Sequence, residues 1–200
     1  MSTSIRHSAL RMNTLVDNLL DMARLEAGAV QLKRAWQPLE EVVGSALAAC
    51  APVLAGRPLR VKLADDLPLL ELDAVLFERV LVNLLENAAK YTPAGSAVEI
   101  AASASSASVT IVVDDHGPGL PPGREESLFD KFERGSKESA TPGVGLGLAI
   151  SRAIVLAHGG TIHGSNRPGP TGTAGARFTI ELPRGTPPAD DGSATAVAVG

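Results

Sequence analysis

The chain has 200 residues, of which 44% are hydrophobic and 3% aromatic, so a soluble core must be built from aliphatic side chains. A net charge of −4 gives no bulk attraction to nucleic acid or anionic lipid, and the single cysteine, Cys50, excludes an intrachain disulfide. No run approaches roughly 18 apolar residues and the N-terminus lacks a signal-peptide core, so we expect a cytoplasmic chain without membrane insertion or nucleic-acid partners.

The first predicted element is a helix over residues 5–27. Its apolar residues recur at three, four or seven positions and leave the charged ones elsewhere, and Gly28 is a natural C-terminal stop. The narrow apolar stripe favours a seam with another helix, and packing on its own domain is the alternative.

Strands and helices then alternate. "VQLKRAW" (30–36) predicts a short strand, "PLEEVVGSALAAC" (38–50) a helix with proline at its start, and "LRVKLAD" (59–65) a second strand. A long helix is expected from about Asp73, a plausible N-cap, to Tyr91.

The second half of the chain predicts a strand pair at 97–103 and 108–114, then an irregular stretch over 115–145 that is long enough to suggest a functional loop. A helix follows over 147–158. A final hairpin is expected from "TIHGS" (161–165) and "GARFTIELP" (175–183), joined by a Gly/Pro-rich turn. After Pro183 the composition predicts a frayed tail.

A polar face on the long helix is the first candidate site. Asn83, Glu86, Asn87 and Lys90 are three or four residues apart in "NLLENAAKYT" and so share one face. Amide and carboxylate oxygens suit Mg²⁺, and Lys90 can neutralise phosphate. A solvated surface is the alternative, although asparagine is a weak helix former and two on one face need a reason.

Two loops are further candidates. In "VVDDHGPGLPP" (112–122) a strand ends in aspartates that can accept a hydrogen bond from a ligand amine, and the glycines permit close approach, although a tight turn would look the same. In "LFDKFERGSKESATPGVGLGLAI" (128–150) phenylalanines and cations precede a glycine turn and helix, a pattern that suits phosphate binding, with a basic surface loop as the alternative. The glycine turn fits neither a Walker A loop, a dinucleotide fingerprint nor a protein kinase glycine loop.

Together and in this order, "NLLENAAKYT", "DHGPG", "FDKF" and "GVGLG" resemble the N, D-x-G-x-G, F and G-x-G-x-G boxes of the ATP-binding domain of bacterial sensor histidine kinases. The finer wording, such as "LFERVLVNLLENAAKYT" and "FDKFERGSKESA", is similar to that of potassium-responsive sensor kinases.

The resemblance implies an α/β two-layer sandwich of the Bergerat type, with a mixed sheet packed on three helices and one long helix before them. It divides the chain into the second helix of a dimerisation hairpin (1–28), the ATP-binding catalytic domain (29–184) and a disordered tail (185–200).

The resemblance also implies the ligands and the roles of the residues. Mg²⁺ would be bound by Asn87 with Asn83 beside it, and Glu86 would orient or deprotonate the nucleophile. Asp115 would accept a hydrogen bond from the adenine amino group. The remaining implied ATP contacts are Lys90, Tyr91, Gly117, Gly119, Lys131, Phe132, Arg134, Gly143, Val144, Gly145, Leu146, Gly147 and Leu148.

The implied reaction transfers the γ-phosphoryl group of ATP to a histidine, and then to an aspartate of a response regulator. The chain departs from the family because the H box that carries the phosphoacceptor is absent. None of the four histidines, His7, His116, His158 and His163, lies in such a motif. The acceptor would therefore come from a histidine-bearing dimerisation domain, and this chain alone should not autophosphorylate. A second departure is Ala176, which stands where the family often has a threonine hydroxyl.

Two other functions stay open. One is an ATPase of the same GHKL superfamily, although gyrase-like and Hsp90-like members have a catalytic glutamate four residues before the Mg²⁺ asparagine, where this chain has Asn83. The other is a non-catalytic module that docks on a partner kinase through 5–28, for which a full set of nucleotide boxes would be unnecessary.

Overall fold

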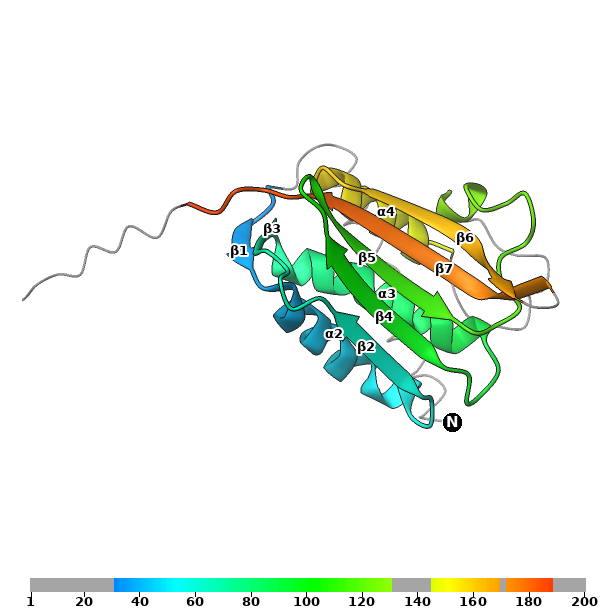
Figure 1. Ribbon diagram of the computed structural model, residues 1–200. Coiled ribbons are helices and arrows are strands. Elements are labelled where there is room, and N and C mark those ends of the chain that lie inside the picture. The colour runs from blue at the N-terminus through cyan, green and yellow to red at the C-terminus, as the bar shows by residue number, and fades with distance from the viewer. Residues whose placement is uncertain (1–30, 131–144, 170–171, 189–200) are drawn as a thin grey trace, which may run out of the picture.

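A computed structural model describes residues 31–130, 145–169 and 172–188, which form two layers (Figure 1). One layer is a five-stranded sheet in the order β2 (Leu59–Leu63), β4 (Val98–Ala104), β5 (Ser108–Asp115), β7 (Gly172–Pro183) and β6 (Thr161–Gly169). The other consists of α2 (Leu39–Leu54), α3 (Ala74–Tyr91) and α4 (Gly147–Ala157). Because β2 is parallel to β4 and the other pairs are antiparallel, the sheet is mixed, and the predicted sandwich is confirmed.

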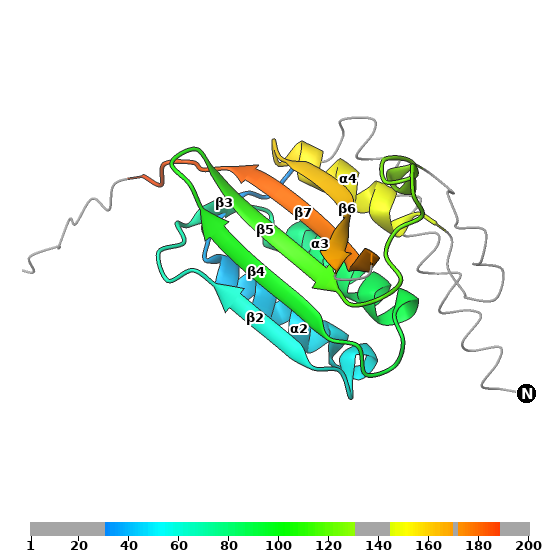
Figure 2. The same cartoon turned by 45° about the vertical axis from the view of Figure 1, so that its right-hand side comes forward.

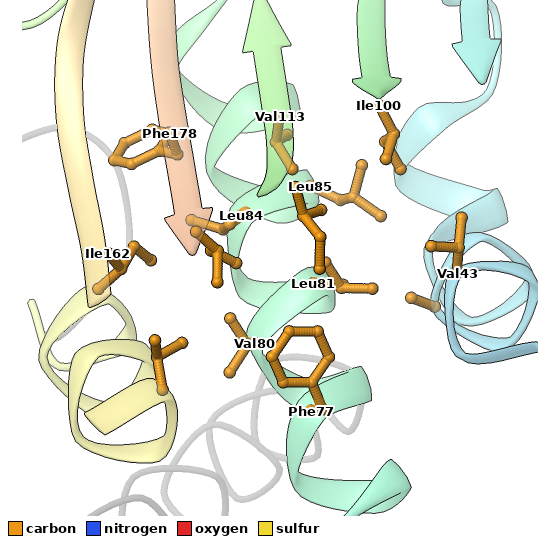
Figure 3. Close-up of a cluster of buried hydrophobic side chains, with 14 of the residues drawn as sticks. Val43, Phe77, Val80, Leu81, Leu84, Leu85, Ile100, Val113, Ile162 and Phe178 are labelled. Carbon is orange, nitrogen blue, oxygen red and sulfur yellow. The ribbon is translucent and has the colours of Figure 1, made fainter. Parts of the chain in front are cut away.

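The central helix α3 organises the core. Asp73 caps it, because its side chain accepts a hydrogen bond from the Leu76 amide at 3.2 Å, as the sequence predicts. The apolar side of α3 packs under the sheet, with Leu81, Leu84 and Leu85 fully buried (Figure 3). The opposite side is left for the polar residues, which fixes where a ligand can approach the helix.

Strand alternation gives the sheet one apolar face. Ile100 of β4 pairs with Val113 of β5, and Ile111 pairs with Ile180 of β7, and all four are buried against the helices. The views in Figures 1 and 2 show the helices on this face only. The other face is polar, and β5 ends at Asp115, where the sheet meets the C-terminal end of α3.

The sequence predictions fail mainly at short or irregular strands. The first strand is β1 (Ala35–Gln37), later than predicted, and its antiparallel partner β3 (Leu70–Leu72) was not predicted. Three-residue strands have no periodic run of their own, so only tertiary pairing defines them. β6 continues to Gly169, beyond the predicted strand, and a 3₁₀ turn, η1 (Ser127–Phe129), interrupts the long loop. The predicted helix over 5–27 lies outside the described residues.

The described segments show no helix long and apolar enough to cross a membrane. The chain is described as far as residue 188, and Gly185 lies against Trp36. A Cβ at Gly185 would stand 2.6 Å from the Trp36 ring.

A buried histidine joins the start of α3 to the end of α4. His158 accepts a hydrogen bond from the Asp73 amide at its Nε2 (3.0 Å), and its Nδ1 is 2.8 Å from the Ile154 carbonyl oxygen. The first contact needs an unprotonated Nε2, so the imidazole is neutral with its proton on Nδ1. Burial lowers the pKa of His158 from its ordinary 6.5, and nearby Arg34 lowers it further, against the opposing effects of the Ile154 carbonyl and Asp73.

We therefore expect the free energy of unfolding to fall as the pH drops below about 6.5. In that range the unfolded chain binds a proton at His158, whereas the folded chain, with its lowered His158 pKa, binds less of it. Urea unfolding at pH 7.5 and pH 5.5 measures this loss. A His158→Gln variant, compared with an exposed control, His163→Gln, should lose the dependence. An unchanged slope in His158→Gln would contradict this assignment.

Candidate functional site

The polar face of α3 is present, but its side chains have different surroundings. Asn83 is half-buried, and its Nδ2 donates to the Gly147 carbonyl (3.2 Å) and to the Ser151 hydroxyl (3.3 Å) of α4. Glu86 is exposed and lies on the side of α2, where burial raises the pKa of Cys50 to about 11 and the charge of Glu86 contributes to the increase. The structure therefore joins Asn83 to the start of α4 and leaves Glu86 facing solvent.

Further along this face, Asn87 is half-buried and has no hydrogen-bonding partner among the described residues. Its amide oxygen is therefore available to a ligand or an ion. At the C-terminal end of the helix, the Lys90 Nζ is 2.7 Å from the Tyr91 hydroxyl and 4.6 Å from the centre of its ring. The two residues thus form a cation–π pair, with the Tyr91 ring partly exposed.

The loop after β5 holds a buried carboxylate in a fixed orientation. Asp115 is 7% exposed, and its Oδ1 accepts hydrogen bonds from the Gly117 and Ala176 amides, both at 2.9 Å. Two bonds to one oxygen leave Oδ2 as the acceptor for an outside donor. Acceptance of a hydrogen bond from a ligand amine by this aspartate stays a prediction, and Oδ2 is the oxygen that would make it.

Close contact brings this loop to the end of α3. A Cβ at Gly117 would lie 2.7 Å from the Thr92 Cγ2, so any larger residue would push the loop away from the helix. Thr92 is itself held, because its hydroxyl donates to the Ala88 carbonyl and accepts from Arg57, both at 2.6 Å. Gly119 has a φ of 82° and ends the turn.

The start of α4 completes the arrangement. Gly145 has a φ of 71°, Leu146 is the buried N-cap, and the helix begins at Gly147 with Leu148 half-buried behind it. The open amides of a helix's first turn attract anions, and here they lie beside Asn83 of α3. Lys131, Phe132, Arg134, Gly143 and Val144 lie outside the described residues.

The described histidines occupy other settings. His116 lies 2.8 Å from Glu99, whose pKa is lowered mainly by this contact. His158 is the buried link described above, and His163 is exposed at 3.5 Å from Glu126. The described residues also contain no group of three His, Cys, Asp or Glu side chains that could hold a metal.

The family model for the histidine kinase-, DNA gyrase B-, and HSP90-like ATPases matches residues 72–186, more than half of the chain. The chain belongs to this family. The match contains α3, the Asp115 loop and the start of α4, and so covers every residue that the sequence singled out as a candidate ligand.

Among its relatives, the chain is 52% identical to the sensor protein KdpD of Escherichia coli K12 over 187 residues, which is 94% of this chain. It spans about a fifth of the length of the curated KdpD relatives. The solved structure of ShkA in complex with AMPPNP has a TM-score of 0.78 and 29% identity, covering 90% of this chain and 37% of that one. The mycobacterial sensor histidine kinase MprB has a TM-score of 0.66 and 29% identity, covering 75% and 97%. The predicted resemblance to sensor kinases of the KdpD type is confirmed.

Sequence reasoning missed several residues that shape the site. Thr92 is the last residue of the N box and Ser151 follows the glycine box, but their side-chain bonds are visible only in three dimensions. Asn166, Arg167 and Gly175 come from the final hairpin and contact the Asp115 loop. In the sequence, these residues stand in the stretch "NRPG" (166–169) and directly before Ala176, and neither position predicts a contact with the loop.

Proposed function

We propose that this chain is the ATP-binding catalytic domain of a KdpD-like sensor histidine kinase. It binds ATP with Mg²⁺ and transfers the γ-phosphoryl group to a histidine on the dimerisation domain of the same kinase. The observation that carries the proposal is that two segments contact the same helix, α3: the Asp115 loop lies against Thr92 at its C-terminal end, and the start of α4 is bonded to Asn83 on its polar face. The similarity to KdpD and to a nucleotide-bound sensor kinase supports it.

The adenine end of the site follows from Asp115. Its Oδ1 is held by two backbone amides, so Oδ2 accepts a hydrogen bond from the adenine amino group. Gly117 allows the loop to lie close against the end of α3 and Gly119 adopts the positive φ of the turn, so the backbone leaves room for the base. The partly exposed ring of Tyr91 offers a stacking surface.

The phosphate end follows from α3 and α4. The amides at Gly145, Leu146, Gly147 and Leu148 and the Lys90 ammonium would offset phosphate charge. Mg²⁺ prefers oxygen ligands and is usually bound by few protein groups together with phosphate oxygens. Asn87, with its uncommitted amide, and the Asn83 oxygen fit such an ion, which would neutralise charge on the phosphates. Contacts from Lys131, Phe132, Arg134, Gly143 and Val144 stay predictions.

The transfer breaks the bond between the γ-phosphorus and the oxygen of ADP and forms a bond to an imidazole nitrogen. Positioning and electrostatics supply most of the catalysis in such reactions. Glu86, exposed beside Asn83 and Asn87, would orient the incoming imidazole or take its proton. The phosphoryl group would then pass to an aspartate of a KdpE-like response regulator, within a membrane sensor kinase that responds to potassium and keeps this domain in the cytoplasm.

The test mixes the purified chain with a separate hairpin bearing the H box of a KdpD relative and γ-labelled ATP. We expect acid-labile label on the hairpin and none on this chain. An Asn87→Ala variant should lose the transfer, and Glu40→Ala, an exposed change on α2, should not. Label on this chain alone would contradict the proposal. ADP release without labelled hairpin would favour an ATPase, and absence of ATP binding would leave a docking module.

A further inference from the structure

The polar face of the sheet carries an arginine pair that the proposed function does not use. Asp114, the residue before Asp115, points to this face with a side chain that is 9% exposed. Arg177 of β7 binds its two oxygens through Nε (2.8 Å) and Nη2 (2.6 Å), and Arg167 of β6 binds Oδ2 through Nε at 3.2 Å. A carboxylate this buried needs one cation, so the second arginine calls for its own explanation.

Arg167 also contacts the chain at Asp115 itself. Its Nη1 donates to the Asp115 carbonyl at 3.0 Å. The β5–β7 ladder ends at the pair Asp114 and Arg177, so the Asp115 carbonyl lies beyond the last ladder position and needs another donor. One guanidinium therefore fixes Asp114 by its carboxylate and Asp115 by its backbone.

A bulge places Arg167 there. Asn166 pairs with Ala176 and Pro168 with Thr173, so Ala174 and Gly175 of β7 both oppose Arg167. Bulges of this kind re-aim side chains and recur next to active sites. In Figure 2 the end of β5 lies beside the paired ends of β6 and β7.

The neighbouring residue holds the other end of the loop. The Asn166 side chain accepts from the Leu120 amide at 2.6 Å and donates to the Leu120 carbonyl at 3.0 Å. Both backbone groups of one loop residue are thus satisfied by one amide side chain. Two consecutive residues of β6 therefore clamp the loop at Asp115 and at Leu120, on either side of Gly117 and Gly119.

We propose that Asn166 and Arg167 are positioning residues that hold the 115–120 loop in the shape that recognises adenine. The proposal rests on the proposed function, since it deepens the role of Asp115. These contacts, which we call the clamp, do not involve the nucleotide. They hold Asp115 and Gly117 in place against the end of α3. Without it the carboxylate would spend more time in orientations that cannot accept from the adenine amine, and selectivity for adenine would fall along with affinity.

Arg167→Met tests this without orphaning a charge, because Arg177 keeps both oxygens of Asp114 and methionine keeps the aliphatic bulk. Arg184→Met is the matched control, since Arg184 also donates to a backbone carbonyl, that of Ser105, at 3.0 Å, at the opposite end of β5. We expect about tenfold weaker ATP binding and a smaller preference for ATP over GTP in Arg167→Met. The control should stay within about twofold, and Arg167→Lys should recover part of the loss.

Two further readouts separate positioning from general stability. In the reaction with the separate hairpin, the KM for ATP should rise in Arg167→Met while kcat changes little. Without nucleotide, hydrogen exchange at the Gly117 and Leu120 amides should speed up in Arg167→Met and in Asn166→Ala. Unchanged exchange in both variants, or unchanged ATP affinity and selectivity in a folded Arg167→Met, would overturn the clamp. If the unaltered chain fails to bind ATP while exchange responds as expected, the proposed function fails and the clamp of the loop stands.

Discussion

Replacing Asp115 by asparagine should weaken ATP binding by about 2–3 kcal/mol, or roughly 30-fold to 150-fold, with little change in the stability of the fold. The Asp115 Oδ1 accepts from two backbone amides. An asparagine must place its oxygen there, because an NH₂ group facing two N–H donors would lose both bonds. Its NH₂ then takes the position of Oδ2 and presents a donor to the adenine amine, which is also a donor.

Isothermal titration with ATP measures the loss, and thermal unfolding shows whether the fold is intact. Asp66→Asn is the control, because Asp66 is exposed in the loop between β2 and β3. GTP binding tests whether the loss arises at the base, since guanine has a carbonyl where adenine has the amine. Asp115→Asn should therefore lose less affinity for GTP than for ATP. If Asp115→Asn binds ATP within about twofold of the unaltered chain, Asp115 does not contact the base.

The sequence predicts this structure best where a helix or strand has a long and regular pattern of apolar residues. The helix α3 was predicted with its cap because apolar residues recur at helical spacing and Asp73 precedes them. The strands β4 and β5 were predicted to within one residue, since both alternate cleanly and a Ser-rich turn joins them. The same periodicity placed Asn83, Glu86, Asn87 and Lys90 on one helical face.

What the sequence could not provide was the environment of each polar side chain. The polar face of α3 reads as four equivalent positions, but neighbouring helices divide it, since Asn83 bonds to α4 and Glu86 lies toward α2. Contacts between Arg167 and Asp115 join residues 52 apart in sequence, and no local pattern encodes such a pair. Three-residue strands such as β3 form only because a partner strand is present.

These missed contacts share a physical cause. The loop after β5 has little apolar surface of its own, so its shape is imposed by backbone contacts with the final hairpin. Asp115 receives the Ala176 amide, Leu120 receives Asn166, and the Asp115 carbonyl receives Arg167. The proposed nucleotide site is therefore supported by the last two described strands, although the residues proposed to contact the nucleotide precede them.

Gly175→Ala should be the most damaging substitution in this support. Gly175 has a φ of 132°, and a Cβ there would stand 1.9 Å from the Asp115 carbonyl oxygen. The Cβ is fixed to the backbone of β7 and the carbonyl oxygen belongs to the backbone of Asp115. Rotation of a side chain therefore cannot relieve the contact, and β7 or the Asp115 loop must move. We expect a loss of more than about 3 kcal/mol in the free energy of unfolding, together with loss of ATP binding.

Two other glycines separate the effect of the steric clash at Gly175 from the effect of its positive φ. Gly44 lies exposed within α2 with open space around it, so Gly44→Ala should stabilise the fold by about 0.5–1 kcal/mol. Gly56 has a φ of 76° and also open space, so Gly56→Ala reports backbone strain alone, about 1–2 kcal/mol. Urea unfolding of all three variants gives the comparison. If Gly175→Ala costs no more than Gly56→Ala, the close approach of β7 to Asp115 is not what holds the loop. If it costs far more and ATP binding falls with it, the bulge of β7 is a structural requirement for nucleotide recognition.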